Sequence, residues 1–101
     1  MADYSFLQTL EDIIKQQKDN DPQKSYTAKL CNKGLNKVTQ KFGEESVEVV
    51  IAALNETNER LVSEISDLLY HLFVLMEKKE IPFEEVIDEL KKRNIEKNGI
   101  N

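Results

Sequence analysis

Apolar residues recur every three or four positions through most of the chain, which is the spacing of amphipathic helices. The long segments with this spacing are residues 6–14, 35–54, 59–79 and 83–90. A shorter segment follows Ser25, which we expect to cap it, and Gly34 is placed to end it. Pro82 suits the first turn of the last helix. Because no segment alternates as a half-buried strand does, the pattern predicts an all-α fold of about five helices.

Two of the long segments are separated only by a polar break at Asn55–Asn58. So short a connection predicts that residues 35–54 and 59–79 form an antiparallel hairpin. Between Leu68 and Met76 the second segment is apolar nearly all round, which is typical of a central, buried helix. We therefore expect a helical bundle around this hairpin. The second helix has more apolar surface than the remaining short helices can cover, which favours a homodimer.

Length and composition favour one small domain. The chain has 101 residues, of which 40% are hydrophobic, so we expect a single domain over residues 1–101 whose tail, about 97–101, frays. It has no long apolar run and no basic, apolar leader, so we expect a cytoplasmic protein without a membrane segment. Cys31 is the only cysteine, which excludes an intrachain disulfide and favours a small core residue. The net charge of −5 argues against nonspecific binding to nucleic acid.

One carboxylate interrupts the apolar stripe of segment 35–54. The spacing requires an apolar residue between Phe42 and Val49, and Glu45 occupies that position. Burying an ionised carboxylate without a partner costs several kcal/mol, so the fold must bring a cation or another element to it. Lys41, one turn away, could serve.

Further acids lie at matching levels of the hairpin. If residue 56 is its apex, Glu45 lies opposite Asp67 and Glu48 lies opposite Glu64, because the members of each pair are equally far from the apex. Four like charges in one space require protons or divalent cations. A ligand set made only of oxygens suits Mg²⁺, with Mn²⁺ as a possible substitute, and Mg²⁺ commonly binds phosphates as well. The alternative is that these acids are only a solvated face of a helical interaction module.

Glu44 lies beside this ligand set. It is a candidate to orient or deprotonate the water that attacks a phosphorus atom, a role that could also belong to Glu45. A di-iron centre is disfavoured, since bundles of that type use two Glu-x-x-His motifs and His71 is the only histidine.

Basic residues near the acids are candidates for substrate binding. Lys29, Lys33, Lys37 and Lys41 recur every four residues and could meet phosphate groups, or they could only solubilise an exposed face. Lys41 should lie level with His71, which would then contact substrate or be a hydrogen-bonded polar group inside a helix interface.

Three further polar residues have two possible roles. Ser25 and Thr27 could cap a helix, bind phosphate, or do both. Arg93 could bind a phosphate or offset the dipole at a helix C-terminus.

The acidic clusters and their surroundings resemble a known family. Glu44-Glu45-x-x-Glu48 followed by Glu64-x-x-Asp67 resembles the signature of the MazG-like all-α nucleoside triphosphate pyrophosphohydrolases. Within that group, the chain resembles the phosphoribosyl-ATP pyrophosphatases of histidine biosynthesis. The motifs that carry this second resemblance are Ser25-Tyr26-Thr27-x-x-Leu30, Lys41-x-Gly43, Asp67-Leu68-Leu69-Tyr70-His71 and Leu90-x-x-Arg93.

The resemblance implies Mg²⁺-dependent hydrolysis of phosphoribosyl-ATP to phosphoribosyl-AMP and pyrophosphate, the second step of histidine biosynthesis. It also implies the dimeric MazG-like architecture, a homodimer of interlocked bundles. Some members are fused to a cyclohydrolase that needs additional cysteines and histidines, so we expect this chain to perform the pyrophosphatase step only. The alternative activity is that of a MazG-like enzyme that clears aberrant nucleotides.

Overall fold

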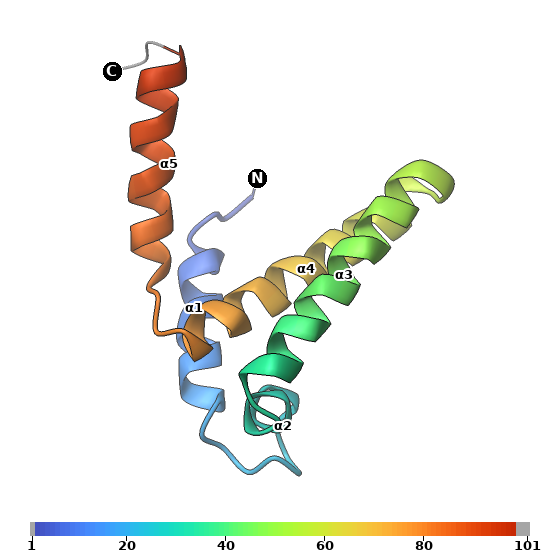
Figure 1. Cartoon of the computed structure of the whole chain (residues 1–101), viewed down its shortest axis with the longest axis vertical. Helices are drawn as coiled ribbons and strands as arrows, with labels where there is room; N and C mark the ends of the chain where they lie inside the picture. Colours follow the sequence, from blue (N-terminus) through green and yellow to red (C-terminus); the bar gives the residue numbers. More distant parts are fainter. Residues whose placement is uncertain (1, 99–101) are drawn as a thin grey trace.

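The computed structural model describes residues 2–98, and the fold is all-helical, as the sequence predicts (Figure 1). The helices are α1 (Phe6–Gln17), α2 (Tyr26–Asn32), α3 (Leu35–Asn55), α4 (Asn58–Lys78) and α5 (Phe83–Asn98). No strand occurs among the described residues. Each helix matches a predicted segment to within a few residues at its start. Helix α5 continues through Asn98, and the rest of the tail expected to fray lies outside the described residues.

Side chains cap the starts of two helices, and the cap at Ser25 is the one that the sequence predicts. The Ser25 hydroxyl accepts a hydrogen bond from the Ala28 backbone N–H at 3.1 Å and so begins α2. The Thr57 hydroxyl does the same for α4 through the N–H of Arg60 at 3.2 Å. Gly34 has a φ of +94° between α2 and α3, a conformation that side chains disfavour, so glycine lets the chain turn sharply there.

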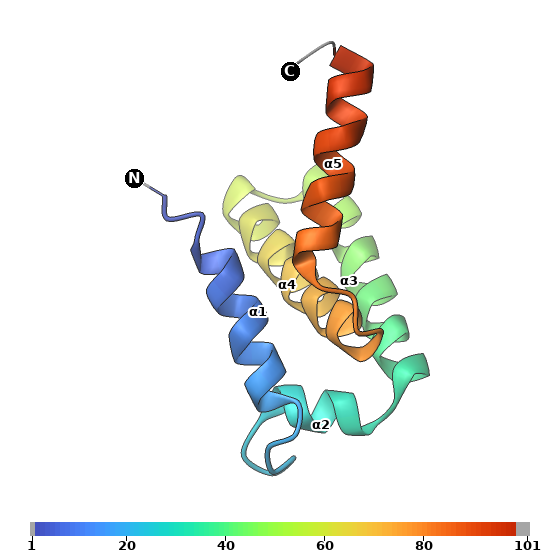
Figure 2. The same ribbon diagram turned by 90° about the vertical axis from the view of Figure 1, so that its left-hand side faces the viewer.

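Helices α3 and α4 form the predicted antiparallel hairpin, joined by Glu56 and Thr57 (Figures 1 and 2). Helix α1 packs on α4, and α2 crosses the end of the hairpin that is remote from this connection. The hydrophobic core lies where these four helices meet, and its buried members are Ile14, Leu30, Cys31, Val38, Phe73, Val74 and Met76. Cys31 is therefore the core residue that the sequence predicts. Phe83, at the start of α5, packs on the Phe73 ring with centroids 4.8 Å apart.

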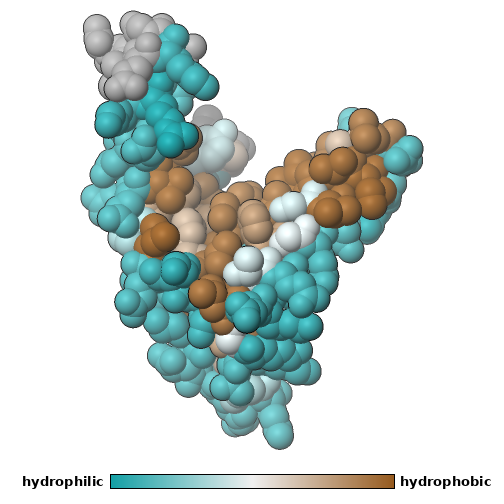
Figure 3. All heavy atoms as spheres, in the orientation of Figure 1, coloured by the Kyte–Doolittle hydropathy of each residue, from teal (hydrophilic) through white to brown (hydrophobic). Residues whose placement is uncertain are grey.

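The half of the hairpin near the α3–α4 connection is left without a cover. Its apolar side chains are more than a third exposed: Val47, Val50, Ile51, Leu54, Val62, Ile65 and Leu69. Figure 3 shows hydrophobic residues gathered over this part of the molecule. Apart from Glu64, the buried residues of α4 therefore lie in its C-terminal half, at His71, Phe73, Val74 and Met76.

The open arrangement also appears in the dimensions of the chain. Its radius of gyration is 15.4 Å, against about 13 Å for a compact domain of 100 residues. Helix α5 contributes to this value, because it diverges from the hairpin after its first turns (Figure 1). None of the helices in the described part of the chain combines the length and apolar character needed to span a bilayer.

Candidate metal and phosphate site

Three carboxylates from the hairpin gather at one place. Glu45, Glu48 and Glu64 each offer an oxygen, and these oxygens lie within 4.8 Å of one another. Helix α3 supplies the first two residues and α4 the third, so Glu48 and Glu64 meet across the hairpin at the predicted level. Glu45 is only 7% exposed and Glu64 only 5%, whereas Glu48 is exposed. The site thus consists of two buried carboxylates, Glu45 and Glu64, and one solvent-exposed carboxylate, Glu48.

Each of the two buried acids has one oxygen occupied and one free. Oε1 of Glu45 lies 3.8 Å from Nζ of Lys41, and Oε1 of Glu64 lies 2.5 Å from a guanidinium nitrogen of Arg60. Oε2 of each acid is buried, and within residues 2–98 no group hydrogen-bonds to it. A buried acceptor without a partner is unfavourable, so these two oxygens suit a bound cation. This chemistry fits an oxygen-loving divalent ion.

The pKa values of the two buried acids are raised for related reasons. Burial is the largest cause for Glu45, followed by the nearby Glu48 carboxylate, which could accept a hydrogen bond from a protonated Glu45 and repels an ionised one. For Glu64 the Glu48 carboxylate, which could accept a hydrogen bond from a protonated Glu64, is the largest cause and burial the second, while Arg60 opposes the rise in pKa. The fold therefore holds these carboxylates where ionisation is unfavourable unless a cation joins them.

Asp67 lies outside the group of three. Its side chain is exposed, yet its negative charge contributes to the raised pKa of both Glu45 and Glu64, so it lies near both. The structure thus brings together three of the four predicted ligands directly and leaves Asp67 at the edge.

Glu44 is exposed on the neighbouring side of α3. The side-chain amide of Gln40 donates a hydrogen bond to it at 2.8 Å, and Nζ of Lys41 lies 3.7 Å away. Both contacts lower the pKa of Glu44, with the amide hydrogen bond the largest cause. Lys41 lies between Glu44 and Glu45, so one ammonium group serves both carboxylates.

His71 is buried beside the carboxylates, and its ring is held from two sides. Nδ1 lies 2.7 Å from the backbone carbonyl of Asp67, which can only accept, so Nδ1 donates. In the neutral ring Nε2 is then an acceptor, and the Tyr26 hydroxyl lies 3.4 Å from it. The electrostatic interaction between His71 and Glu45 is consistent with the predicted level of the histidine.

A second contact between α2 and α4 lies next to this one. The hydroxyls of Thr27 and Tyr70 form a hydrogen bond, and the rings of Tyr70 and His71 pack edge to face. Thr27 and Ser25 are both buried, with Ser25 engaged as the cap of α2. Sequence analysis did not foresee the contacts of Tyr26 and Tyr70, although both tyrosines stand inside the motifs that carry the resemblance.

The row of lysines lines a hollow of about 260 Å³ beside the site. The lining residues are Tyr26, Lys29, Leu30, Lys33, Lys37 and Lys41. Lys41 connects the hollow to the carboxylates, and Lys37 reaches the side chain of Gln40 at 3.4 Å. In the described part of the chain Lys29 and Lys33 form no ion pair. The hollow thus contains four cationic side chains and no acid.

Arg93 is not brought to the site within one copy of the chain. It pairs with Glu89 of its own helix at 2.9 Å, and both side chains are largely exposed. They lie on α5, which points away from the hairpin (Figure 1).

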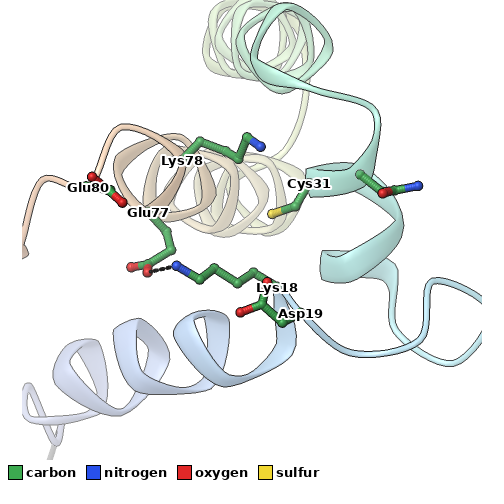
Figure 4. A pocket seen from close by; sticks show the side chains of 7 residues that line it. Lys18, Asp19, Cys31, Glu77, Lys78 and Glu80 are labelled. Carbon is green, nitrogen blue, oxygen red and sulfur yellow. Dashed lines mark hydrogen bonds and ion pairs between the residues drawn. The ribbon is translucent and has the colours of Figure 1, made fainter.

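A separate hollow of about 320 Å³ lies between the end of α1, α2 and the end of α4 (Figure 4). Lys18 and Glu77 form an ion pair across it at 2.9 Å. Cys31 lies at its wall, and burial raises the pKa of the thiol. None of the predicted site residues lines this hollow.

Comparison with known proteins gives a consistent result. Residues 7–94 match the family model described as phosphoribosyl-ATP pyrophosphohydrolase. A phosphoribosyl-ATP pyrophosphatase of Metallosphaera sedula is 51% identical over 87 residues, which cover 86% of this chain and 94% of that protein. A protein of the same name from Clostridium botulinum is 48% identical over 87 residues, covering 86% of this chain and 79% of the relative.

Longer relatives also match. The histidine biosynthesis bifunctional protein HisIE of Oceanobacillus iheyensis is 44% identical over 100 residues, which cover 96% of this chain. That alignment covers 46% of the relative, so the chain spans a little under half the length of such bifunctional proteins.

Proposed function

Because this chain belongs to the phosphoribosyl-ATP pyrophosphohydrolase family, we propose that it hydrolyses phosphoribosyl-ATP between the α and β phosphates. The products are phosphoribosyl-AMP and pyrophosphate, and the reaction is the second step of histidine biosynthesis. The observation that carries this proposal is the pair of buried carboxylate oxygens without partners, on Glu45 and Glu64, next to a hollow lined with lysines. We place the activity in the cytoplasm.

The proposed cofactor is Mg²⁺, with Mn²⁺ as a substitute. Glu45, Glu48 and Glu64 would hold it, and Asp67 would join them by a small change of its exposed side chain. When bound, the ion supplies positive charge that neutralises phosphate oxygens and makes the phosphorus easier to attack. Protein oxygens alone are suitable ligands for this ion.

The residues of the chain itself have separable roles in the proposed reaction. Glu44 stays ionised, because Gln40 and Lys41 lower its pKa, and it is exposed, so it can accept a hydrogen bond from the attacking water. Lys41 lies at the junction of the carboxylates and the hollow, where it can neutralise a phosphate next to the bond that breaks. The Asp67 carbonyl and the Tyr26 hydroxyl fix the orientation of the His71 ring. His71 contacts substrate only if the Tyr26 hydroxyl moves aside.

Four further residues complete the proposed substrate contacts. Lys33 is available in the hollow. Ser25 caps α2 and Thr27 bonds α2 to α4 through Tyr70, and we propose that both act on substrate through the position of Tyr26. Arg93 can reach a site only in an assembly, since its helix diverges from the hairpin.

A substrate panel tests the activity. With Mg²⁺ present, pyrophosphate release should be rapid from phosphoribosyl-ATP and slow from deoxynucleoside triphosphates. The reverse preference would instead support an enzyme that clears aberrant nucleotides. Release from neither substrate, together with no effect of Mg²⁺ on stability, would leave only an interaction module.

Residue substitutions make the same test sharper. Glu45→Gln and Asp67→Asn should abolish turnover and preserve the helical circular dichroism signal, because both changes remove charge and keep volume. Near-normal turnover in either variant would remove that residue from the ligand set.

We further propose that the functional form is a homodimer. The uncovered apolar face of the hairpin consists of residues from both α3 and α4, and exposed faces of this kind usually mark an interface. The large radius of gyration supports the same proposal, because a second copy would fill the open side of the chain.

Light scattering after gel filtration tests this assembly. The natural chain should have twice the 11.7 kDa mass, whereas Ile51→Glu should shift it toward the monomer. Gln16→Glu, an equal charge change on exposed α1, should leave the mass unchanged. A monomeric natural chain at micromolar concentration would overturn the proposal.

A further inference from the structure

The lysine hollow concentrates positive charge beside the carboxylates. Four cationic side chains line this hollow, although the net charge of the whole chain is −5, and no acidic residue belongs to the lining. Lys41 already faces Glu44 and Glu45, but Lys29 and Lys33 form no ion pair among the described residues. Like charges gathered without counter-charges repel one another, so the hollow is suited to a multivalent anion.

The lysines differ in their distance from the carboxylates. At 1.5 Å per residue, Lys37 lies about 6 Å along α3 from Lys41. Lys29 lies in α2 and Lys33 at its end, so both are separated from α3 by the turn at Gly34 while lining the same hollow. An anion bound by these two lysines is therefore separate from the phosphates held at the acids.

We infer that Lys29 and Lys33, with Lys37, bind a second phosphate of the substrate, a phosphomonoester at the end of the nucleotide remote from the bond that breaks. This inference rests on the proposed function, and it assigns to the hollow the choice between phosphoribosyl nucleotides and ordinary nucleoside triphosphates. Ordinary nucleotides have no phosphate at that end, so they leave the hollow empty. Ammonium groups on flexible side chains are suitable partners for such a dianion.

Tyr26 forms the wall between the hollow and the buried histidine. Its ring is 54% exposed, and its hydroxyl reaches His71. A molecule that extends from the carboxylates into the hollow would pass this ring, which gives the nucleotide a flat surface between its two charged ends.

The test compares Lys33→Gln and Lys29→Gln with Lys91→Gln, a neutralising control on exposed α5. KM and kcat are measured with phosphoribosyl-ATP, and ATP is titrated as a competitive inhibitor. We expect each variant in the hollow to raise KM for phosphoribosyl-ATP about tenfold, with kcat and the inhibition constant of ATP unchanged. The control should match the natural chain in all three quantities.

Ribose 5-phosphate provides a probe that does not depend on turnover. Its binding, followed by NMR line shifts, should weaken about tenfold in Lys33→Gln and remain unchanged in Lys91→Gln. Lys29 and Lys33 are both exposed, so folding should persist in their variants, which circular dichroism checks.

Two outcomes would overturn the inference. If KM for phosphoribosyl-ATP and the inhibition constant of ATP rise together, the lysines bind the triphosphate instead. If ribose 5-phosphate binds the natural chain and Lys33→Gln equally, the hollow holds no phosphomonoester. Failure of the proposed function looks different, because then the natural chain itself releases no pyrophosphate from phosphoribosyl-ATP.

Discussion

Replacing Glu45 by glutamine should stabilise the metal-free protein and at the same time remove its response to Mg²⁺. Two like charges no more than 4.8 Å apart repel by at least about 3.5 kcal/mol at an effective dielectric constant of about 20. Lys41 at 3.8 Å and the water around Glu48 offset most of this repulsion. We therefore expect a net gain of about 1 kcal/mol, which raises Tm by about 4–8 °C in a domain of this size.

Metal binding should raise the stability of the natural chain by more than the loss of one charge raises the stability of Glu45→Gln. An ion that binds only the folded state adds about 2.7 kcal/mol at a concentration one hundred times its Kd. That corresponds to a rise in Tm of about 10–20 °C. The order of stability of the two proteins should therefore reverse as Mg²⁺ is added.

Differential scanning calorimetry in EDTA and in increasing Mg²⁺ measures both effects. Glu44→Gln is the matched control, since Glu44 is adjacent in sequence but stands outside the group of three acids. It should keep the full rise in Tm with Mg²⁺. If Glu45→Gln is less stable than the natural chain in EDTA, or if Mg²⁺ stabilises both equally, the metal assignment of Glu45 is refuted.

Three further outcomes follow from the contacts described above. The raised pKa values of Glu45 and Glu64 mean that the folded state holds their protons more tightly. In EDTA, the stability that these two acids contribute is therefore complete below the carboxyl pKa of the unfolded chain, and it is lost as pH rises through their raised pKa values in the folded state. Thermal unfolding from pH 4 to 8 should detect this loss, and the loss should be smaller in Glu45→Gln. Tyr70→Phe should lower the free energy of unfolding by about 1–3 kcal/mol, because it leaves the buried Thr27 hydroxyl without its partner. In urea unfolding, Thr27→Val should cost less stability in the Tyr70→Phe background than in the natural chain, whereas fully additive losses would count against the contact. Gly34→Ala should lower the free energy of unfolding by about 1–3 kcal/mol because residue 34 has a φ of +94°, although the added methyl group meets no atom within 4 Å. An unchanged midpoint of urea unfolding would show that the turn tolerates a side chain.

Much of the site follows from local sequence. The interruption of an apolar stripe by Glu45 predicts a buried acid, and the short connection at residues 55–58 predicts that Glu48 and Glu64 meet. Both results depend on helical periodicity and on the geometry of one tight hairpin. Such relations are fixed by distances along the chain, so sequence alone is sufficient for them.

Other features depend on where the helices come together. The contacts of Tyr26 with His71 and of Thr27 with Tyr70 join residues more than forty positions apart, and no periodicity links such residues. The same limit applies to Asp67. Its predicted position on the hairpin places its charge near the other acids, but its side chain lies outside the group of three carboxylates.

By itself, the sequence determined the helices, the Ser25 cap, the central hairpin and the acids that it turns inward. Only the tertiary structure decided that α2 folds against α4, that the lysines on both sides of Gly34 share one hollow, and that Arg93 lies away from the acids. The physical reason is that periodicity fixes which face of a helix a residue occupies. Packing against other helices decides what that face meets.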